Sequence, residues 1–255
     1  MSTRNTPSDV TNEDGPIREP SPAGVSYPNG GHALDPGCSR CPDLADCRTR
    51  IAWGNGDPDA DVMVVGEAPA AGDPDADRWQ GGNLTGLAYT SRHSGRRIRR
   101  LVAACGYADR TYYTNSVKCF PRDTDAERET NREPTPAERR RCSDHLRTEL
   151  DSVRPSVVCP TGKHATAAVL ALVGCRIEDV ADGFIATVLQ PIELDGLEVG
   201  STDGTETDAH AGSKTVTVLP LLHPSYRDVW APRIGYETAD AYRDAVREAL
   251  STVVD

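Results

Sequence analysis

The chain has 255 residues and a formal net charge of −11, from 39 acidic and 28 basic side chains. This length suits one large domain with a tail and is sufficient to bury a substantial core. It contains no run of about eighteen apolar residues, and its first residues lack the apolar stretch of a secretory signal, so we expect a cytoplasmic protein that does not cross a membrane.

The charged residues are unevenly chosen, because lysine occurs only at Lys118, Lys163 and Lys214 while arginine and aspartate are abundant. An acidic, lysine-poor surface is typical of proteins adapted to a salty cytoplasm, where ions screen self-repulsion. An ordinary acidic protein from a GC-rich genome would have the same composition, and both interpretations stand. The net charge weighs against nucleic acid as a partner unless a basic surface is confined to one region.

Residues 1–36 are rich in Pro, Gly, Ser, Asn and Asp, and we expect them to form a disordered tail before a domain over 37–255. Apolar runs then predict strands in "DVMVVGEAP", "TYYTNSVKC", "SVVCPTG" and "KTVTVLPLLHP". Helices are expected in "SGRRIRRLVAACG", "TPAERRRCSDHLRTELDSVRP", "KHATAAVLALVG" and "TADAYRDAVREALSTVV". In the second helix Thr135 and Glu138 have the spacing of a capping box.

Alternating strands and helices predict an α/β fold, a three-layer α/β/α sandwich around a central, mostly parallel sheet. Two polar insertions, 122–133 and 195–213, interrupt the alternation and are expected to be surface loops. Sheets of this kind place their sites at the carboxyl ends of the strands, at a switch point of the topology.

Four polar or aromatic residues fall near predicted strand ends. Glu67 follows the first strand, between Gly66 and Ala68, and Asn115 lies on the second. His223 lies at the end of the last strand, and Tyr89 lies in the loop before the first helix. Each has a structural explanation alone: an exposed turn carboxylate, a strand-end cap, a turn histidine and a core aromatic ring. Together they predict a pocket for a flat heterocycle with a hydrogen-bonding edge.

The eight cysteines divide into two groups. Three lie in apolar surroundings and are assigned to the core: Cys105, Cys159 and Cys175. The candidate metal ligands are Cys38, Cys41, Cys119 and Cys142, with Cys47 as a lower-ranked rival. Four thiolates suit zinc or a four-iron cluster, provided that the N-terminal segment folds back towards the later pair.

With these residues in place, the chain resembles the iron–sulfur uracil-DNA glycosylases of families four and five. The resemblance rests on "CSRCPDLADCRTRIAWGNGDPDADVMVVGEAPA", "YTNSVKCFP…PTPAERRRC" and "LLHPSYR", in the family's order. "GEAP" is similar to family four, whereas "APAA" and "GGNLTG" followed by an aromatic-Thr pair look more like family five. Arg92 stands where family five has an aspartate, and the loop over 72–80 is longer.

The resemblance implies a base-excision repair enzyme that hydrolyses the N-glycosidic bond of uracil in single- or double-stranded DNA after base flipping. It implies a [4Fe-4S] cluster on Cys38, Cys41, Cys119 and Cys142. His223 would donate a hydrogen bond to the leaving base, and Glu67 would orient water, with Asp73 as the second choice. The substrate-binding residues would be Gly66, Ala68, Tyr89 and Asn115.

For DNA contact the sequence offers a basic stretch, "SRHSGRRIRR", and the residues after "HP". We expect Arg96, Arg97, Arg100, Ser225, Tyr226 and Arg227 to contact the nucleic acid, although a charge run is more often a solvated helix face. Two alternatives stay open: a non-catalytic iron–sulfur protein that binds nucleic acid, and a glycosylase that also removes deaminated purines. Under each of these interpretations we expect the protein to be a monomer.

Overall fold

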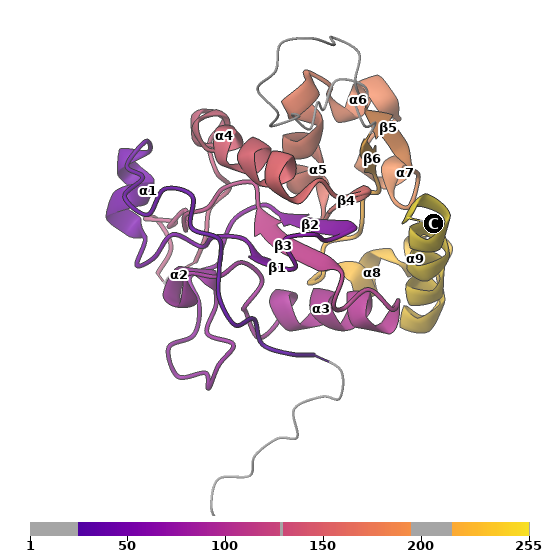
Figure 1. The fold of residues 1–255 in the computed structure, drawn as a ribbon, viewed down its shortest axis with the longest axis horizontal. Coiled ribbons are helices and arrows are strands. Elements are labelled where there is room, and N and C mark those ends of the chain that lie inside the picture. Colours follow the sequence, from indigo (N-terminus) through magenta and orange to yellow (C-terminus); the bar gives the residue numbers. More distant parts are fainter. Residues whose placement is uncertain (1–24, 128–129, 195–215, 255) are drawn as a thin grey trace, which may run out of the picture.

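The computed structural model describes residues 25–127, 130–194 and 216–254 (Figure 1). Their strands form one six-stranded sheet in the order β1-β3-β2-β4-β6-β5. The strands are β1 (Asn55–Gly56), β2 (Val62–Gly66), β3 (Thr111–Asn115), β4 (Val157–Pro160), β5 (Ile192–Leu194) and β6 (Val216–Val218). The four central strands are parallel, and the edge strands β1 and β5 are antiparallel to their neighbours, which confirms a mostly parallel sheet.

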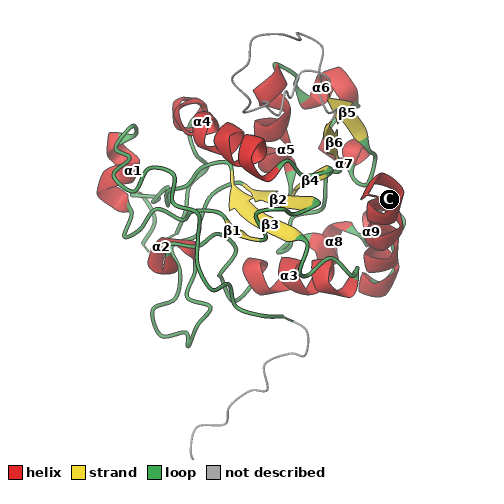
Figure 2. Ribbon diagram, in the orientation of Figure 1, coloured by secondary structure: helices red, strands yellow, loops and turns green. Residues whose placement is uncertain are grey.

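Helices cover both faces of the sheet (Figure 2). On one face lie α3 (Ser94–Ala104), α8 (Arg227–Trp230) and α9 (Ala239–Val254), and on the other α4 (Pro136–Val153) and α5 (Lys163–Leu170). Strand β2 shows why both faces are needed: Val62 and Val64 belong to the core shared with α3 and α9, while Met63 and Val65 belong to the core shared with α4 and α5. The three-layer α/β/α architecture is therefore confirmed.

The long predicted helices are all present, and α4 begins with the expected capping box. Glu138 N donates to Thr135 Oγ1 over 3.2 Å, and Thr135 N donates to Glu138 Oε2 over 2.7 Å. The sequence did not predict the short elements: α1 (Pro42–Cys47), α2 (Gly82–Thr85), α6 (Ile177–Val180), α7 (Phe184–Thr187) and the 3₁₀ helices Ala171–Val173 and Pro232–Ile234. They span too few residues to show a hydrophobic period. No helix of the described part is long and apolar enough to cross a membrane.

One residue of the expected tail contacts the sheet. His32 N donates to Gly54 O over 2.8 Å, and its ring stacks on Tyr112 at 5.2 Å. The domain boundary at 37 stays a prediction. The rest of the expected tail, residues 1–24, and the insertion 195–213 lie outside the described residues.

Of the cysteines assigned to the core, Cys105 and Cys159 are buried. Cys175 packs against the core on the α4 and α5 face but remains partly exposed, because it follows the 3₁₀ turn that ends α5.

A buried ion pair supports the end of β3. Lys118 Nζ donates to Glu149 Oε2 over 2.5 Å, to Thr114 Oγ1 over 2.7 Å and to Asn115 O over 2.6 Å. Both charged side chains are 1% exposed. All three ammonium protons are thus used, which is what makes a buried charge tolerable. The pair connects α4 to the strand end that carries Asn115.

Replacing Glu149 by methionine should leave the Lys118 ammonium buried without its counter-ion. We expect a loss of about 3–5 kcal/mol in the free energy of unfolding, measured by urea denaturation. The double variant K118M/E149M should recover much of this loss. Asp144→Asn, which breaks the exposed Arg40–Asp144 pair, is the control and should change stability by about 1 kcal/mol or less. Equal effects of the two single substitutions would contradict the role of the buried pair.

Candidate active site and cysteine centre

A cavity of about 890 Å³ opens at the carboxyl ends of the central strands. It is lined by Gly66, Glu67 and Ala68 after β2, by Asn115 at the end of β3, and by Tyr89 and His223 from two loops. The six residues that the sequence analysis placed around a base therefore do share one cavity. The chain passes from β2 to β3 on one side and then to β4 on the other, so the cavity lies at the switch point of the sheet.

The absence of a side chain at Gly66 allows neighbouring side chains to approach its backbone closely. A Cβ atom there would lie 2.3 Å from Asn115 Oδ1 and 2.9 Å from Tyr89 Oη, distances that no side chain tolerates. The carboxamide of Asn115 and the phenol of Tyr89 therefore both lie close to the backbone of Gly66 at the end of β2.

Tyr89 is held in a strained conformation by several contacts. Its φ is 53°, a value unusual for a residue with a side chain. Its hydroxyl shares a 2.6 Å hydrogen bond with Thr161 Oγ1, and its carbonyl accepts from Arg99 Nε over 3.1 Å. Its ring meets that of Tyr113 edge-on at 6.0 Å. These contacts fix the ring at the wall of the cavity, and strain of this kind is typical of functional sites.

His223 is held in a defined tautomer. Ser225 N donates to its Nδ1 over 3.2 Å, so Nδ1 is unprotonated and the proton of the neutral ring is on Nε2. Burial lowers the pKa of His223, and the charge of His164 lowers it further. Gly162, with a φ of 89°, packs against the ring; a Cβ there would lie 3.0 Å from that of His223. The site therefore presents a neutral N–H donor.

Glu67 is a carboxylate with an unsatisfied oxygen. Its Oε1 is buried and has no hydrogen-bond partner within the part of the chain that the structure describes. Burial raises the pKa of Glu67, while the charge of His164 opposes the rise. The backbone is fixed, because Glu67 O accepts from Val117 N over 2.9 Å and from Ser116 Oγ over 2.8 Å. A free oxygen in a buried cavity is suited to hold a water molecule.

Asp73, the second choice for orienting water, is not brought to the cavity. It is exposed in the loop after β2, where its Oδ1 accepts from Asp75 N over 3.1 Å. This is the geometry of a turn-forming aspartate.

Sequence reasoning missed several residues of the cavity wall. Thr161 and His164 follow β4, and the strand-end rule applied to that strand would have found them. Glu133 ends the 122–133 insertion, which folds back on itself through the pairing of Arg122 with Asn131. No pattern in the sequence shows that the end of this surface loop turns into the cavity.

Two of the residues expected to contact DNA reach the cavity. Ser225 and Tyr226 line it, and Tyr226 is 61% exposed. Arg97 donates to Pro224 O over 3.3 Å, Arg227 pairs with Asp228, and Arg96 lies over the ring of Trp79 at 6.0 Å. Arg100 is exposed on α3, whereas its neighbour Arg99 is buried with its guanidinium 3.9 Å from the centre of the Tyr113 ring.

The four candidate ligands Cys38, Cys41, Cys119 and Cys142 line a second, smaller pocket next to α1 and α4. The N-terminal segment does fold back towards the later pair, as the ligand set requires. Cys47 is not part of this pocket wall. Burial raises the pKa of Cys142 to about 12 and also raises the pKa of Cys41 and Cys119.

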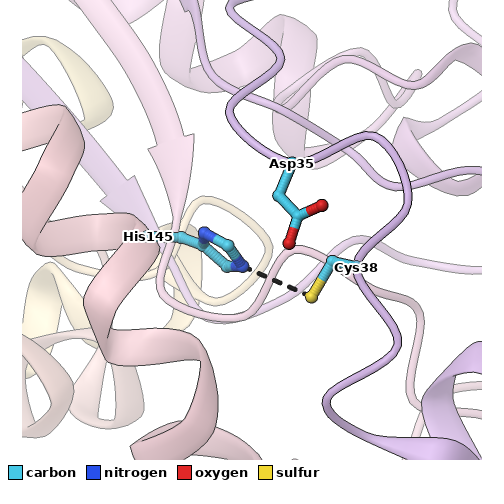
Figure 3. A group of neighbouring side chains, drawn as sticks. All are labelled: Asp35, Cys38 and His145. Atoms are coloured by element: carbon cyan, nitrogen blue, oxygen red, sulfur yellow. Dashed lines mark hydrogen bonds between the residues drawn. The ribbon is translucent and has the colours of Figure 1, made fainter.

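Each of the four sulfur atoms has a nitrogen partner. His145 Nε2 lies 3.4 Å from Cys38 Sγ, with Asp35 beside them (Figure 3). Arg48 Nη1 donates to Cys119 Sγ over 3.2 Å, Lys118 N donates to Cys142 Sγ over 3.3 Å, and Arg141 bonds to Cys41. The cationic donors Arg48 and Arg141 and the backbone amide of Lys118 fit sulfur ligands that carry negative charge, as in an iron–sulfur cluster or a zinc site.

The chain is similar to known proteins over most of its length. The family model described as the uracil DNA glycosylase superfamily matches residues 53–250. A type-5 uracil-DNA glycosylase of Pyrobaculum aerophilum is 32% identical over 166 residues, which cover 54% of this chain and 66% of that protein, just under two thirds.

Type-4 uracil-DNA glycosylases match over longer stretches. The protein of Archaeoglobus fulgidus is 26% identical over 74% of this chain and 76% of its own length. The protein of Thermotoga maritima is 28% identical over 74% of this chain and 77% of its own length. Relatives of both types agree with the mixed features of the loop after β2. From the fold, the cavity and the extent of the family match, the chain belongs to the uracil DNA glycosylase superfamily.

Proposed function

We propose that this protein is a DNA glycosylase that hydrolyses the N-glycosidic bond of uracil in DNA. The observation that carries the proposal is the meeting of Glu67, Tyr89, Asn115 and His223 in one cavity at the switch point of the sheet. The relatives that bear the name uracil-DNA glycosylase support the activity, and they do not favour the non-catalytic alternative.

Cleavage of this bond develops negative charge on the departing base and positive charge on the sugar. A neutral His223 donates its Nε2 proton in a hydrogen bond to a carbonyl oxygen of the base, where the negative charge builds up. The lowered pKa of His223 suits this role, because it keeps the ring neutral, with Nδ1 accepting from Ser225 N and the Nε2 proton free to donate to the departing base. Glu67, in its ionised form, orients a water molecule towards the sugar and favours the developing positive charge.

The base is held by stacking on Tyr89 and by hydrogen bonds from Asn115 to its edge. Tyr89 offers an aromatic face whose hydroxyl is already bonded to Thr161, and Asn115 offers a carboxamide next to Gly66. The two ends of a carboxamide, one donor and one acceptor, match the pairing edge of uracil and mismatch that of cytosine. The target base reaches this cavity only after rotating out of the helix. A cavity of about 890 Å³ does not exclude a deaminated purine by size, so edge contacts set the base range.

DNA is held at the cavity mouth by a surface of Arg96, Arg97, Arg100, Ser225, Tyr226 and Arg227. The exposed ring of Tyr226 beside the cavity is placed to fill the gap that the extruded base leaves. The surface is local, which reconciles DNA binding with a net charge of −11. We expect the protein to act as a monomer in the cytoplasm.

The pocket of four cysteines is proposed to hold a [4Fe-4S] cluster. The donor set and the four nitrogen partners support this assignment. When bound, the cluster would tie the segment before α1 to the end of β3 and to α4. Arg48, Arg141 and the Lys118 amide then offset the negative charge of the ligating sulfurs.

His223→Ala should slow uracil release by about 10²–10³-fold in single turnover, because one preorganised donor to the developing anion is lost. Affinity for uracil-containing DNA, measured by fluorescence anisotropy, should stay near that of the wild type. A variant that binds DNA poorly but releases uracil normally once saturated would contradict the electrostatic role.

Asn115→Asp should impair recognition of uracil, because an ionised carboxylate no longer donates to the uracil edge. We expect uracil release to fall while the ratio of uracil to cytosine release narrows, as measured on matched oligonucleotides. An unchanged rate and an unchanged ratio would remove Asn115 from base recognition.

The purified protein should be brown, with the broad visible absorbance of an iron–sulfur cluster. Cys142→Ala should lose this absorbance and its iron, measured by metal analysis. Cys47→Ala is the matched control and should keep both, since Cys47 lies outside the pocket. A colourless protein loaded with zinc would overturn the cluster assignment, and equal losses in both variants would overturn the ligand set.

A further inference from the structure

A histidine that no motif singles out lines the same cavity as the two proposed reactive residues, Glu67 and His223. His164 is the second residue of α5, directly after the end of β4, and it lines the cavity. One of its ring nitrogens, a carboxylate oxygen of Glu67 and a carboxylate oxygen of Glu133 all lie within 4.8 Å of one another. His164 also acts on His223 through its charge.

A carboxylate outside the reaction centre holds the ring of His164. The Nδ1 atom of His164 lies 3.0 Å from Glu133 Oε1, which makes an ion pair when the ring is protonated. The same oxygen accepts from Arg139 Nη1 over 2.8 Å, so Arg139 in turn holds Glu133. The three residues come from the end of the 122–133 insertion and from the first turns of α4 and α5.

Building on the proposed glycosylase function, we propose that His164, held by Glu133, is a positioning residue that keeps Glu67 ionised and His223 neutral during uracil release. It touches neither the base nor the water in this role, and it acts through its charge on the two residues that do.

The electrostatic effects at Glu67 and at His223 agree with this assignment. Burial raises the pKa of Glu67, and the positive charges of His164 and Arg139 act against that rise, whereas Glu133 adds to it. At His223, burial lowers the pKa and the charge of His164 lowers it further. A single positive charge that acts on both therefore favours both of the protonation states that the reaction requires.

Other charged groups share the cavity wall. Arg132 lies there but is bonded to Glu138, and the charge of Lys163 acts on Glu133. The acidic groups of the wall are Glu67, Glu133, Glu178 and Asp182. Arginine and lysine stay charged throughout the working range, so among these cations only His164 is of a type that titrates between about pH 5 and 8. Replacing His164 should therefore change how the rate of uracil release depends on pH.

The test is the single-turnover rate of uracil release against pH for the wild type, His164→Gln and His164→Lys. In His164→Gln the pKa of Glu67 rises, so the acid limb of the rate profile should shift to higher pH by about one pH unit. The rate on that limb then falls about tenfold, and the difference from the wild type should shrink as the pH rises, because histidine is the one type of side chain among these cations that loses its charge near neutral pH. His164→Lys, which keeps the charge, should restore the acid limb.

His32→Gln, at an exposed histidine outside both the cavity wall and the basic stretch, is the matched control and should leave the profile unchanged. Thermal unfolding of each variant separates folding defects from the pH effect. A His164→Gln profile that overlays the wild type, or one lowered equally at every pH, would overturn the charge role. So would loss of wild-type activity on adding a chelator specific for Mg²⁺ and Ca²⁺, since a cation on the same groups would then supply the charge. If the wild type releases no uracil, the proposed function itself fails, which is a distinct outcome.

Discussion

The close approach of Asn115 and Tyr89 to the backbone of Gly66 is the constraint on which the rest of the site depends. A side chain at Gly66 would occupy the space that the carboxamide and the phenol fill. Because β2 and β3 are parallel neighbours in register from Val62 with Thr111 to Gly66 with Asn115, both strands end at the same level. The sheet therefore builds the base pocket from backbone geometry, and the loops add Tyr89 and His223 to it.

The two proposed reactive groups have opposite electrostatic needs in the same cavity. Burial moves both towards their neutral forms, which suits His223 but not Glu67. Positive charge near both acts against this conflict, and His164 is the residue proposed to supply it, because its charge opposes the rise at Glu67 and lowers the pKa of His223 further. Pairs of titratable groups whose environments separate their protonation states are typical of acid–base active sites.

The cysteine pocket and the base pocket share a structural element. The backbone amide of Lys118 donates to Cys142 Sγ over 3.3 Å, and its ammonium donates to Asn115 O over 2.6 Å. One residue thus connects a ligand of the proposed cluster to the residue proposed to read the base. Order in the cysteine pocket therefore supports order at the end of β3.

Much of the fold could be predicted from the sequence. The central strands appear as short apolar runs, and the long helices show the apolar spacing of an amphipathic helix. The alternation of strands and helices predicted the sheet, and the strand-end rule placed Glu67, Asn115 and His223 at one edge. The same rule applied to β4 would have found His164. Glu133 could not be found that way, since its position depends on how the end of the 122–133 loop returns to the cavity. Asp73 was expected near the cavity because it follows Glu67 closely in the sequence. The turn after β2 instead places it at the surface, and the sequence alone does not show this turn. The cysteine set came from resemblance, as spacing alone left Cys47 open.

The central claim is that this cavity accepts an everted uracil and releases it as an anion. The most direct measurement incubates the protein with otherwise identical oligonucleotides that carry uracil or cytosine, and assays free base together with alkali-labile abasic sites. The account predicts that free uracil and abasic sites appear in equal amounts, while the cytosine oligonucleotide stays intact. A uracil oligonucleotide that is bound and remains uncleaved at its glycosidic bond would contradict it.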